Sequence, residues 1–346
     1  MSRQRFLFVE GYGAFVGRRS QRLYVKHQGK IVEEAPVLFL EQVLISGRAV
    51  TVSSDALALC AGQGIPVHYL SWKGTPYAAV YAAGLGGTVQ TRRAQYMAYE
   101  DERGTHLASA FAKGKLLNQS RLLKYLAKSR KEKEPDVYQT LREAAKTVEN
   151  HISGLKEWRA TAQKRGLDEV RAHLLSIEGR AAQSYWEGLR AVVPDTLNWP
   201  GRRGRGARDA VNSALNYGYG VLYGQVERAI VLAGLDPYAG FIHADRPGKP
   251  SLVLDLIEEF RAPVVDRVIW GMIGLGMALT VDEKGLLAQE TRRTIAERVL
   301  ARLEESTERY ERKRHKLRWI LQTQARHIAT YLRGERGEYK PFISGW

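Results

Sequence analysis

Two acidic residues and one histidine stand out in this sequence as candidates for chemistry. Glu178 interrupts an apolar stripe in which residues such as Leu174 and Tyr185 recur at helical spacing. An ionised carboxylate on a buried stripe is costly unless a cation compensates its charge. His243 lies in a segment rich in Gly and Pro, and Glu258 follows in an apolar stretch. Oxygen ligands with one imidazole suit Mg²⁺ or Mn²⁺, and the imidazole favours Mn²⁺. Such an ion would stabilise charge on a phosphodiester under attack.

Asp255 precedes Glu258 by three residues, so both side chains can project from the same side of a helix. It is either a further metal ligand or a group that orients His243. The equal alternative is an acid in a first turn, stabilised by the helix dipole. For the whole set the alternative is structural: Glu178 would pair with an arginine, Glu258 would be solvated and His243 would cap its loop.

A second candidate is a loop in which arginines alternate with glycines. Guanidinium groups on a flexible glycine backbone can hold phosphate oxygens with two N–H groups each. A solvated surface loop is the alternative. Three tyrosines and several glycines follow, for which core packing and close helix contact are favoured over stacking on bases. The arginines are Arg202, Arg203, Arg205 and Arg208, and the tyrosines are Tyr217, Tyr219 and Tyr223.

Composition points to an anionic partner. The chain has 346 residues, with 53 Lys and Arg against 37 Asp and Glu, a formal net charge of +16. This balance favours nucleic acid. A membrane is disfavoured because the longest apolar run, residues 268–281, is too short to span a bilayer. Cys60 is the only cysteine, which excludes an intramolecular disulfide and a Cys-rich zinc site. The N-terminus lacks a signal-peptide pattern, so we expect a soluble, cytoplasmic protein.

The elements that must position these residues divide into two halves, which predicts an α+β fold. Residues 1–84 are punctuated by glycine and rich in short β-type stretches, with one helix from Ser54, its expected N-cap, through Gln63. Residues 85–90 form a linker, and 91–346 are expected to form a larger, all-α domain. The basic run Arg309–Arg318 is expected on a solvated helix face. The predicted strands cover 6–9, 14–16, 23–25, 43–45, 50–52, 67–70 and 78–81, and the predicted helices cover 88–130, 136–164, 167–192, 207–234, 251–260, 266–281 and 288–333.

Several segments, in the same order along the chain, resemble the CRISPR-associated protein 1 family, the integrases of CRISPR adaptation. Any one segment is weak evidence, but together they cover most of the chain and are specific. The segments are 115–119 (KLLNQ), 177–179 (IEG), 208–217 (RDAVNSALNY), 240–243 (GFIH) and 251–261 (SLVLDLIEEFR).

The resemblance implies a β domain that mediates homodimerisation, followed by a helical catalytic domain. It implies a divalent-metal site built from Glu178, His243 and Glu258, with Asp255 as the close second for the last ligand. It also implies a complex with the small CRISPR-associated protein 2 that inserts short double-stranded DNA fragments into the CRISPR array. In this reaction the 3′-OH of the fragment attacks a phosphodiester of the CRISPR repeat. His243 would shuttle a proton or position the phosphate. The arginine loop would hold the DNA backbone. Lys115 and Arg261 would do the same or would orient the carboxylates.

Two other functions use the same residues. A stand-alone nuclease acting on branched or repair DNA would employ the same metal site with water as the nucleophile. A non-catalytic DNA-binding scaffold would keep Glu178 in a structural ion pair. Joining of a DNA 3′ end to a target distinguishes an integrase from the stand-alone nuclease. A scaffold has no DNA processing to lose, so substitution of Glu178 would leave its behaviour unchanged.

Overall fold

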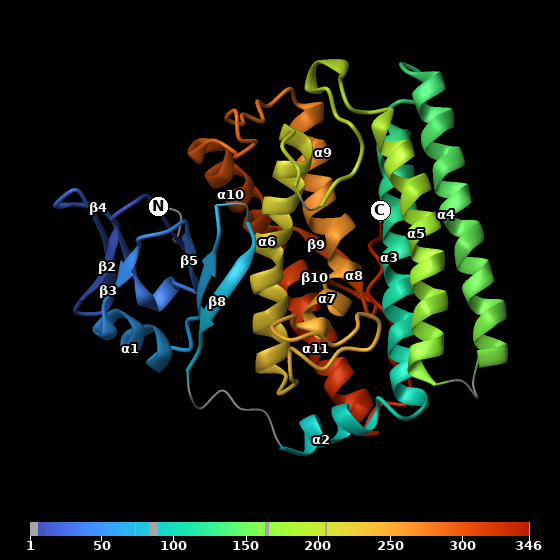
Figure 1. Ribbon diagram of the computed structural model, residues 1–346, viewed down its shortest axis with the longest axis horizontal. Helices are drawn as coiled ribbons and strands as arrows, with labels where there is room; N and C mark the ends of the chain where they lie inside the picture. Colours follow the sequence, from blue (N-terminus) through green and yellow to red (C-terminus); the bar gives the residue numbers. More distant parts are fainter. Residues whose placement is uncertain (1–5, 73, 83–88, 163–165, 205, 346) are drawn as a thin grey trace.

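Two small β-sheets precede a larger group of helices (Figure 1). The computed structural model describes residues 6–72, 74–82, 89–162, 166–204 and 206–345, with the backbone alone for 155–162. The linker predicted at 85–90 therefore lies mostly outside the described residues, and α2 (Val89–Met97) begins at its end. One sheet has the strand order β1-β5-β7-β8 and the other β4-β3-β2-β6. The strands are β1 (Phe6–Glu10), β2 (Phe15–Arg19), β3 (Arg22–His27), β4 (Lys30–Pro36), β5 (Gln42–Ser46), β6 (Thr51–Val52), β7 (Val67–Leu70) and β8 (Pro76–Val80).

Alternation of side chains along β1 and β5 explains how the first sheet joins the two halves. Leu7 and Val43 point into the core of the N-terminal part, which also contains buried Cys60 of α1 (Ser54–Gly62). Leu44 points the other way, into the core of the helical part. Successive residues of a strand face opposite sides, so one short sheet closes two cores. The N-cap of α1 is Ser53, whose side chain accepts from Ala56 N, and not Ser54 as expected.

The helical part is built around three long helices and one central helix. α3 (Glu102–Lys128), α4 (Pro135–Ala162) and α5 (Leu167–Arg190) run side by side, and α6 (Ala210–Leu232) lies between them and the sheet that ends in β8 (Figure 1). The remaining elements are η1 (Val37–Phe39), η2 (Asp195–Leu197), α7 (Ser251–Leu256), α8 (Glu258–Phe260), the π-helical turn η3 (Arg261–Asp266), α9 (Arg267–Gly274), α10 (Gln289–Glu305), β9 (Thr307–Tyr310), β10 (Lys313–Lys316) and α11 (Leu317–Leu332).

Glycines of α6 let the first sheet approach this helix closely, whereas the sequence predicted close contact with another helix. A Cβ at Gly220 would fall 1.5 Å from the carbonyl oxygen of Gly74, in the turn before β8. A Cβ at Gly224 would lie 3.2 Å from the ring of His68 on β7. Larger residues at these positions would push the two halves apart.

The prediction of an α+β fold is confirmed, but the expectation of an all-α second half is wrong. Residues 306–316 leave the helical path and form the antiparallel hairpin β9–β10, which divides the helix predicted at 288–333. The helix predicted at 88–130 is also divided, by a turn whose Asp101 caps α3. Acids and bases four residues apart fit a helix and a twisted hairpin equally well, so charge spacing misled the prediction at 306–316. No helix in the described residues is long and apolar enough to cross a membrane.

Candidate functional site

Glu178 and Glu258 come from different helices and share one cation. Glu178 lies in α5 and Glu258 begins α8, and both are buried. The ammonium group of Lys115, on α3, lies 3.7 Å from Glu178 Oε2 and 3.2 Å from Glu258 Oε2. The structural alternative for Glu178 was a pairing with arginine and for Glu258 was exposure to solvent. The partner is instead a lysine, and Glu258 is 3% exposed.

The two carboxylates are compensated unequally. Burial raises the pKa of Glu178, and Lys115 offsets this only in part. Burial acts in the same direction on Glu258, but Arg261 and Lys115 outweigh it and hold the pKa of that carboxyl below its usual range. The geometry agrees, since Glu258 Oε1 has Arg261 Nη1 at 2.7 Å whereas Glu178 Oε1 is buried with no hydrogen-bond partner among the described residues. The cluster therefore has room for more positive charge at Glu178.

Asp255 orients His243 and uses its own oxygens to do so. Asp255 is fully buried, and Oδ1 accepts from the backbone N–H of His243 at 2.9 Å and lies 2.8 Å from its ring Nδ1. Oδ2 accepts from the backbone N–H of Phe241 and Ile242. A carboxylate with this many partners fixes the loop and the ring, and leaves the other ring nitrogen, Nε2, for a ligand.

Arg261 packs against Tyr219, which is itself held by a hydrogen bond to Asp266. Its guanidinium lies 4.9 Å from the ring centroid of Tyr219. The hydroxyl groups of Tyr219 and Tyr185 both donate to Asp266, the second at 2.6 Å. Asp266 was not singled out from the sequence, although an acid within the apolar stretch 262–270 is the same kind of signal that identified Glu178. Tyr217 and Tyr219 are buried, as core packing predicted, and Tyr223 is partly buried.

Glu259, next to Glu258, belongs to a different set of contacts that we term the tail anchor. It is fully buried and accepts from Tyr339 Oη at 2.6 Å, Gln324 Nε2 at 2.8 Å and the Phe342 backbone N–H at 2.8 Å. The side chain of Asn118 on α3 donates to the backbone carbonyls of Glu259 and Phe342. These contacts fix α8 between α3, α11 and residues 339–344. Sequence reasoning missed Glu259, because two adjacent acids give no sign of which one faces the site.

The arginine loop is fastened to the start of α6. Arg202 Nη2 donates to Asn216 Oδ1 at 2.8 Å, while Asn212 and Asn216 donate to the backbone carbonyls of Gly201 and Gly204. The expectation of a flexible loop is therefore wrong for its described part. Arg203 and Arg208 are exposed, and Arg205 lies outside the described residues.

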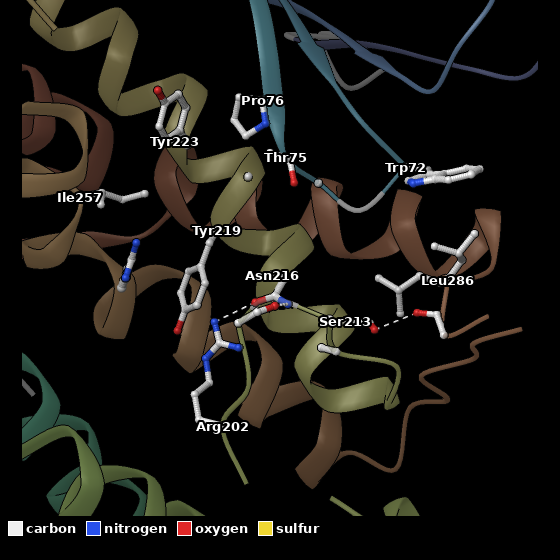
Figure 2. A pocket seen from close by; sticks show the side chains of 18 residues that line it. Trp72, Thr75, Pro76, Arg202, Ser213, Asn216, Tyr219, Tyr223, Ile257 and Leu286 are labelled. Atoms are coloured by element: carbon white, nitrogen blue, oxygen red, sulfur yellow. Dashed lines mark hydrogen bonds between the residues drawn. The ribbon is translucent and has the colours of Figure 1, made fainter. Parts of the chain in front are cut away.

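Two cavities with shared wall residues lie between this loop and Glu258. The larger, about 390 Å³, lies between the loop, α6 and the turn around Thr75 (Figure 2). The smaller, about 110 Å³, is bounded by Lys115 and Glu258. The walls of both include Arg202, Tyr219 and Arg261. Arginines thus line both cavities, and Glu258 lines the smaller one.

A divalent ion fits the chemistry of this site. Among the residues that the structure describes, no three His, Cys, Asp or Glu side chains already form a group that could hold a metal. Lys115 instead lies between the two carboxylates, and the orphaned Oε1 of Glu178 and the oriented ring of His243 are ligand types that Mg²⁺ and Mn²⁺ accept.

Comparison with known proteins identifies the family of this chain. Residues 7–301 match the profile of the family described as CRISPR associated protein Cas1. The chain is 38% identical to the CRISPR-associated endonuclease Cas1 1 of Archaeoglobus fulgidus, over 98% of this chain and 99% of that protein.

Two solved structures share the fold. One is a casposase bound to integration product, with a TM-score of 0.80, 22% identity and coverage of 97% of this chain and 93% of the other. The second is a Cas6-RT-Cas1–Cas2 complex, with a TM-score of 0.74, 20% identity and coverage of 100% of this chain and 37% of the longer one. With most of its length matching the family profile and its full length aligning with a curated member, this chain belongs to the Cas1 family of CRISPR-associated proteins.

Proposed function

We propose that this protein is a metal-dependent DNA integrase and endonuclease of CRISPR adaptation. It would insert short foreign DNA fragments into the CRISPR array through attack of a 3′-OH on a phosphodiester. The observation that carries the proposal is the unequally compensated pair Glu178 and Glu258, of which Glu258 borders a cavity that is also lined by Lys115, Arg202 and Arg261. The cationic side chains suit the negatively charged phosphodiester, and the incompletely neutralised carboxylates suit a metal ion.

The residues that would hold a metal ion are Glu178, His243 and Glu258. We propose Mn²⁺ or Mg²⁺, which when bound would stabilise negative charge on the phosphodiester. Asp255 would act as a positioning residue and not as a ligand, since both of its oxygens already accept hydrogen bonds within the protein.

The chain's own cations have two roles in this proposal. Arg261 and Lys115 stabilise the ionised form of Glu258, and they border the cavity that the phosphate would enter. Arg202, Arg203 and Arg208 would hold the DNA backbone, and Arg205 belongs to the same set. His243 would position the phosphate or transfer a proton at Nε2, with Asp255 fixing the ring.

The assembly is also part of the proposal. We assign residues 1–84 to a dimerisation domain, 85–90 to a linker and 91–346 to the catalytic domain. Large apolar side chains exposed on the N-terminal part, among them Tyr12, Val32 and Leu38, support a homodimer that covers them. The Cas1–Cas2 complex among the structural neighbours supports the small CRISPR-associated protein 2 as partner. Double-stranded DNA in the cytoplasm, as fragment and as repeat, would be the substrate.

An integration assay tests the proposal. Labelled short duplex DNA, supercoiled plasmid with a CRISPR repeat and the small partner are incubated with Mn²⁺, Mg²⁺ or EDTA. We expect label to join the plasmid, and joining to disappear in EDTA, in Glu178→Gln and in His243→Ala. Glu187→Gln is the matched control, since it makes the same chemical change at an exposed position of α5.

The other functions give different results in this assay. Cutting without joining would favour the stand-alone nuclease. DNA binding with neither cutting nor joining, unchanged in Glu178→Gln, would leave only the scaffold.

A further inference from the structure

The hairpin β9–β10 carries a basic face that the proposed site does not use. Arg314 pairs directly with Arg309 across the hairpin, and Lys316 pairs with Thr307. Side chains two residues apart on a strand, and those directly opposite, share one face of a hairpin. Arg309, Arg314 and Lys316 therefore occupy the same face, and all three are exposed.

This face concentrates charge without local compensation. In the described part of the chain, none of these three cations forms an ion pair with a carboxylate; Arg314 donates only to the hydroxyl and the carbonyl of Thr307. Like charges directly opposite each other destabilise a hairpin. The pairing of Arg309 with Arg314 therefore opposes folding of this segment.

The turn of the hairpin is also unfavourable. Glu311 and Arg312 connect the strands with φ of 47° and 70°. Two-residue turns of this kind favour Asn and Gly, because other side chains are strained at positive φ. Arg312, at the tip, adds a fourth exposed cation.

The other face of the hairpin is firmly held. Tyr310 Oη donates to Gln324 Oε1 of α11 at 2.8 Å, and the His315 ring stacks on Trp319 with centroids 3.8 Å apart. Glu308 is buried and pairs with Arg302 at 2.8 Å. The surrounding structure thus fixes the position of a segment whose outer face and turn are both unfavourable. Locally unfavourable features that the fold retains are common at functional sites.

We propose that Arg309, Arg314 and Lys316, with Arg312 at the tip, form a second DNA-binding surface that contacts the phosphate backbone of duplex DNA outside the cavity. The inference rests on the proposed function in one respect, that the substrate is DNA. Binding phosphates would relieve the repulsion between Arg309 and Arg314, and guanidinium groups match phosphate geometry. An extended row of cations without aromatic or apolar side chains on the same face fits a nucleic-acid backbone better than a protein surface, whose centre is usually apolar.

The test measures binding of duplex DNA in EDTA, so that catalysis does not enter the result. The variant is Arg309→Thr with Lys316→Thr, which keeps the contacts of Arg314. The matched control is Lys26→Thr with Lys30→Thr, which removes two exposed charges from the hairpin β3–β4, where they do not face a like charge. We expect the first variant to weaken binding roughly tenfold at moderate salt and to lower the slope of log affinity against log salt by about 2, while the control changes both much less.

A second readout separates binding from folding. Removal of Arg309 relieves the cross-strand repulsion, so the melting temperature of the first variant should be unchanged or higher. Weaker DNA binding at undiminished stability would support the proposal.

Three results would overturn it. Unchanged affinity and slope would show that the face does not touch DNA. An equal loss of DNA affinity in both double variants would show that these residues act only through the net charge of the protein. Unchanged DNA binding with loss of the small protein partner would make it a protein interface. If wild-type protein fails to bind DNA at all, the proposed function itself is wrong, which is a distinguishable failure.

Discussion

Glu258 and Glu259 are adjacent in the sequence and both buried, yet they belong to opposite kinds of environment. Glu258 faces Lys115 and Arg261 and is held by charge. Glu259 faces Tyr339, Gln324 and the Phe342 backbone and is held by neutral hydrogen bonds that occupy both of its oxygens. Burial raises the pKa of Glu259 to about 7, whereas the cations lower that of Glu258. The comparison teaches that burial alone does not identify a carboxylate of the proposed site; what separates these two residues is that cations neighbour Glu258, whereas Glu259 has only neutral hydrogen-bond donors.

The strongest test of the comparison is Glu178→Gln, on the charged side. We expect DNA joining and cutting to fall by roughly 10²–10³-fold, because the amide cannot supply the negative charge that the site requires. The free energy of unfolding should change by less than about 1 kcal/mol or increase, since a buried charge is removed. Single-turnover kinetics and urea denaturation measure the two effects. A large loss of stability would show that Glu178 is structural.

The reverse pattern is expected on the tail-anchor side. Glu259→Ala leaves three buried donors without an acceptor, so we expect a loss of roughly 3 kcal/mol or more in unfolding free energy. Tyr339→Phe, which removes one hydroxyl, should cost about 1 kcal/mol. Denaturant titration gives both values, and the folded fraction should keep its DNA-processing rate within about tenfold. A rate as low as that of Glu178→Gln would mean that the two carboxylates are not functionally distinct.

Asp255→Asn tests a carboxylate that is held by hydrogen bonds, as Glu259 is, but that orients a residue of the proposed metal site. The amide keeps the size of the side chain but cannot accept all the hydrogen bonds that orient His243 and its loop. We expect metal affinity to fall about 10–100-fold. Titration with Mn²⁺ checks this, and excess metal should restore activity in Asp255→Asn but not in Glu178→Gln. Equal failure of both variants would favour Asp255 as a direct ligand.

His68 extends the comparison to a buried titratable group outside the site. Its effect is on the pH dependence of the unfolding free energy, and it is the smallest effect that we predict. Burial, with a contribution from Arg228, lowers the pKa of His68 to about 3 in the folded protein, against about 6.5 when unfolded. Between these values the unfolded chain binds more protons, so stability is complete above about pH 6.5 and falls as the pH decreases.

The size of this effect should reach about 1 kcal/mol near pH 5.5. The difference in unfolding free energy between wild type and His68→Gln, followed from pH 7.5 to 5, isolates it from the nearby Glu227. A difference that does not change with pH would contradict the buried, neutral imidazole.

Much of the fold followed from residue patterns. Short stretches rich in Val, Phe, Tyr and Ile marked β1, β5 and β7, and long stretches rich in Ala, Leu, Glu, Arg and Lys marked α4, α5 and α6 to within a few residues. The hairpin β9–β10 was missed because its pattern of charges also satisfies a helix. Tyr310 and His315 pack against α11, and that packing decides between the two conformations.

The sequence by itself determined which residues could do chemistry. Glu178 was conspicuous as a charge on an apolar stripe, and the basic excess indicated an anionic partner. Only the tertiary structure decided how the charges are paired: Lys115 lies between Glu178 and Glu258, Asp255 faces His243, and Glu259 faces the tail anchor. The physical reason is that charge compensation and hydrogen bonding depend on distances of a few ångströms between side chains far apart in the chain, and packing of α3, α5 and α8 sets those distances.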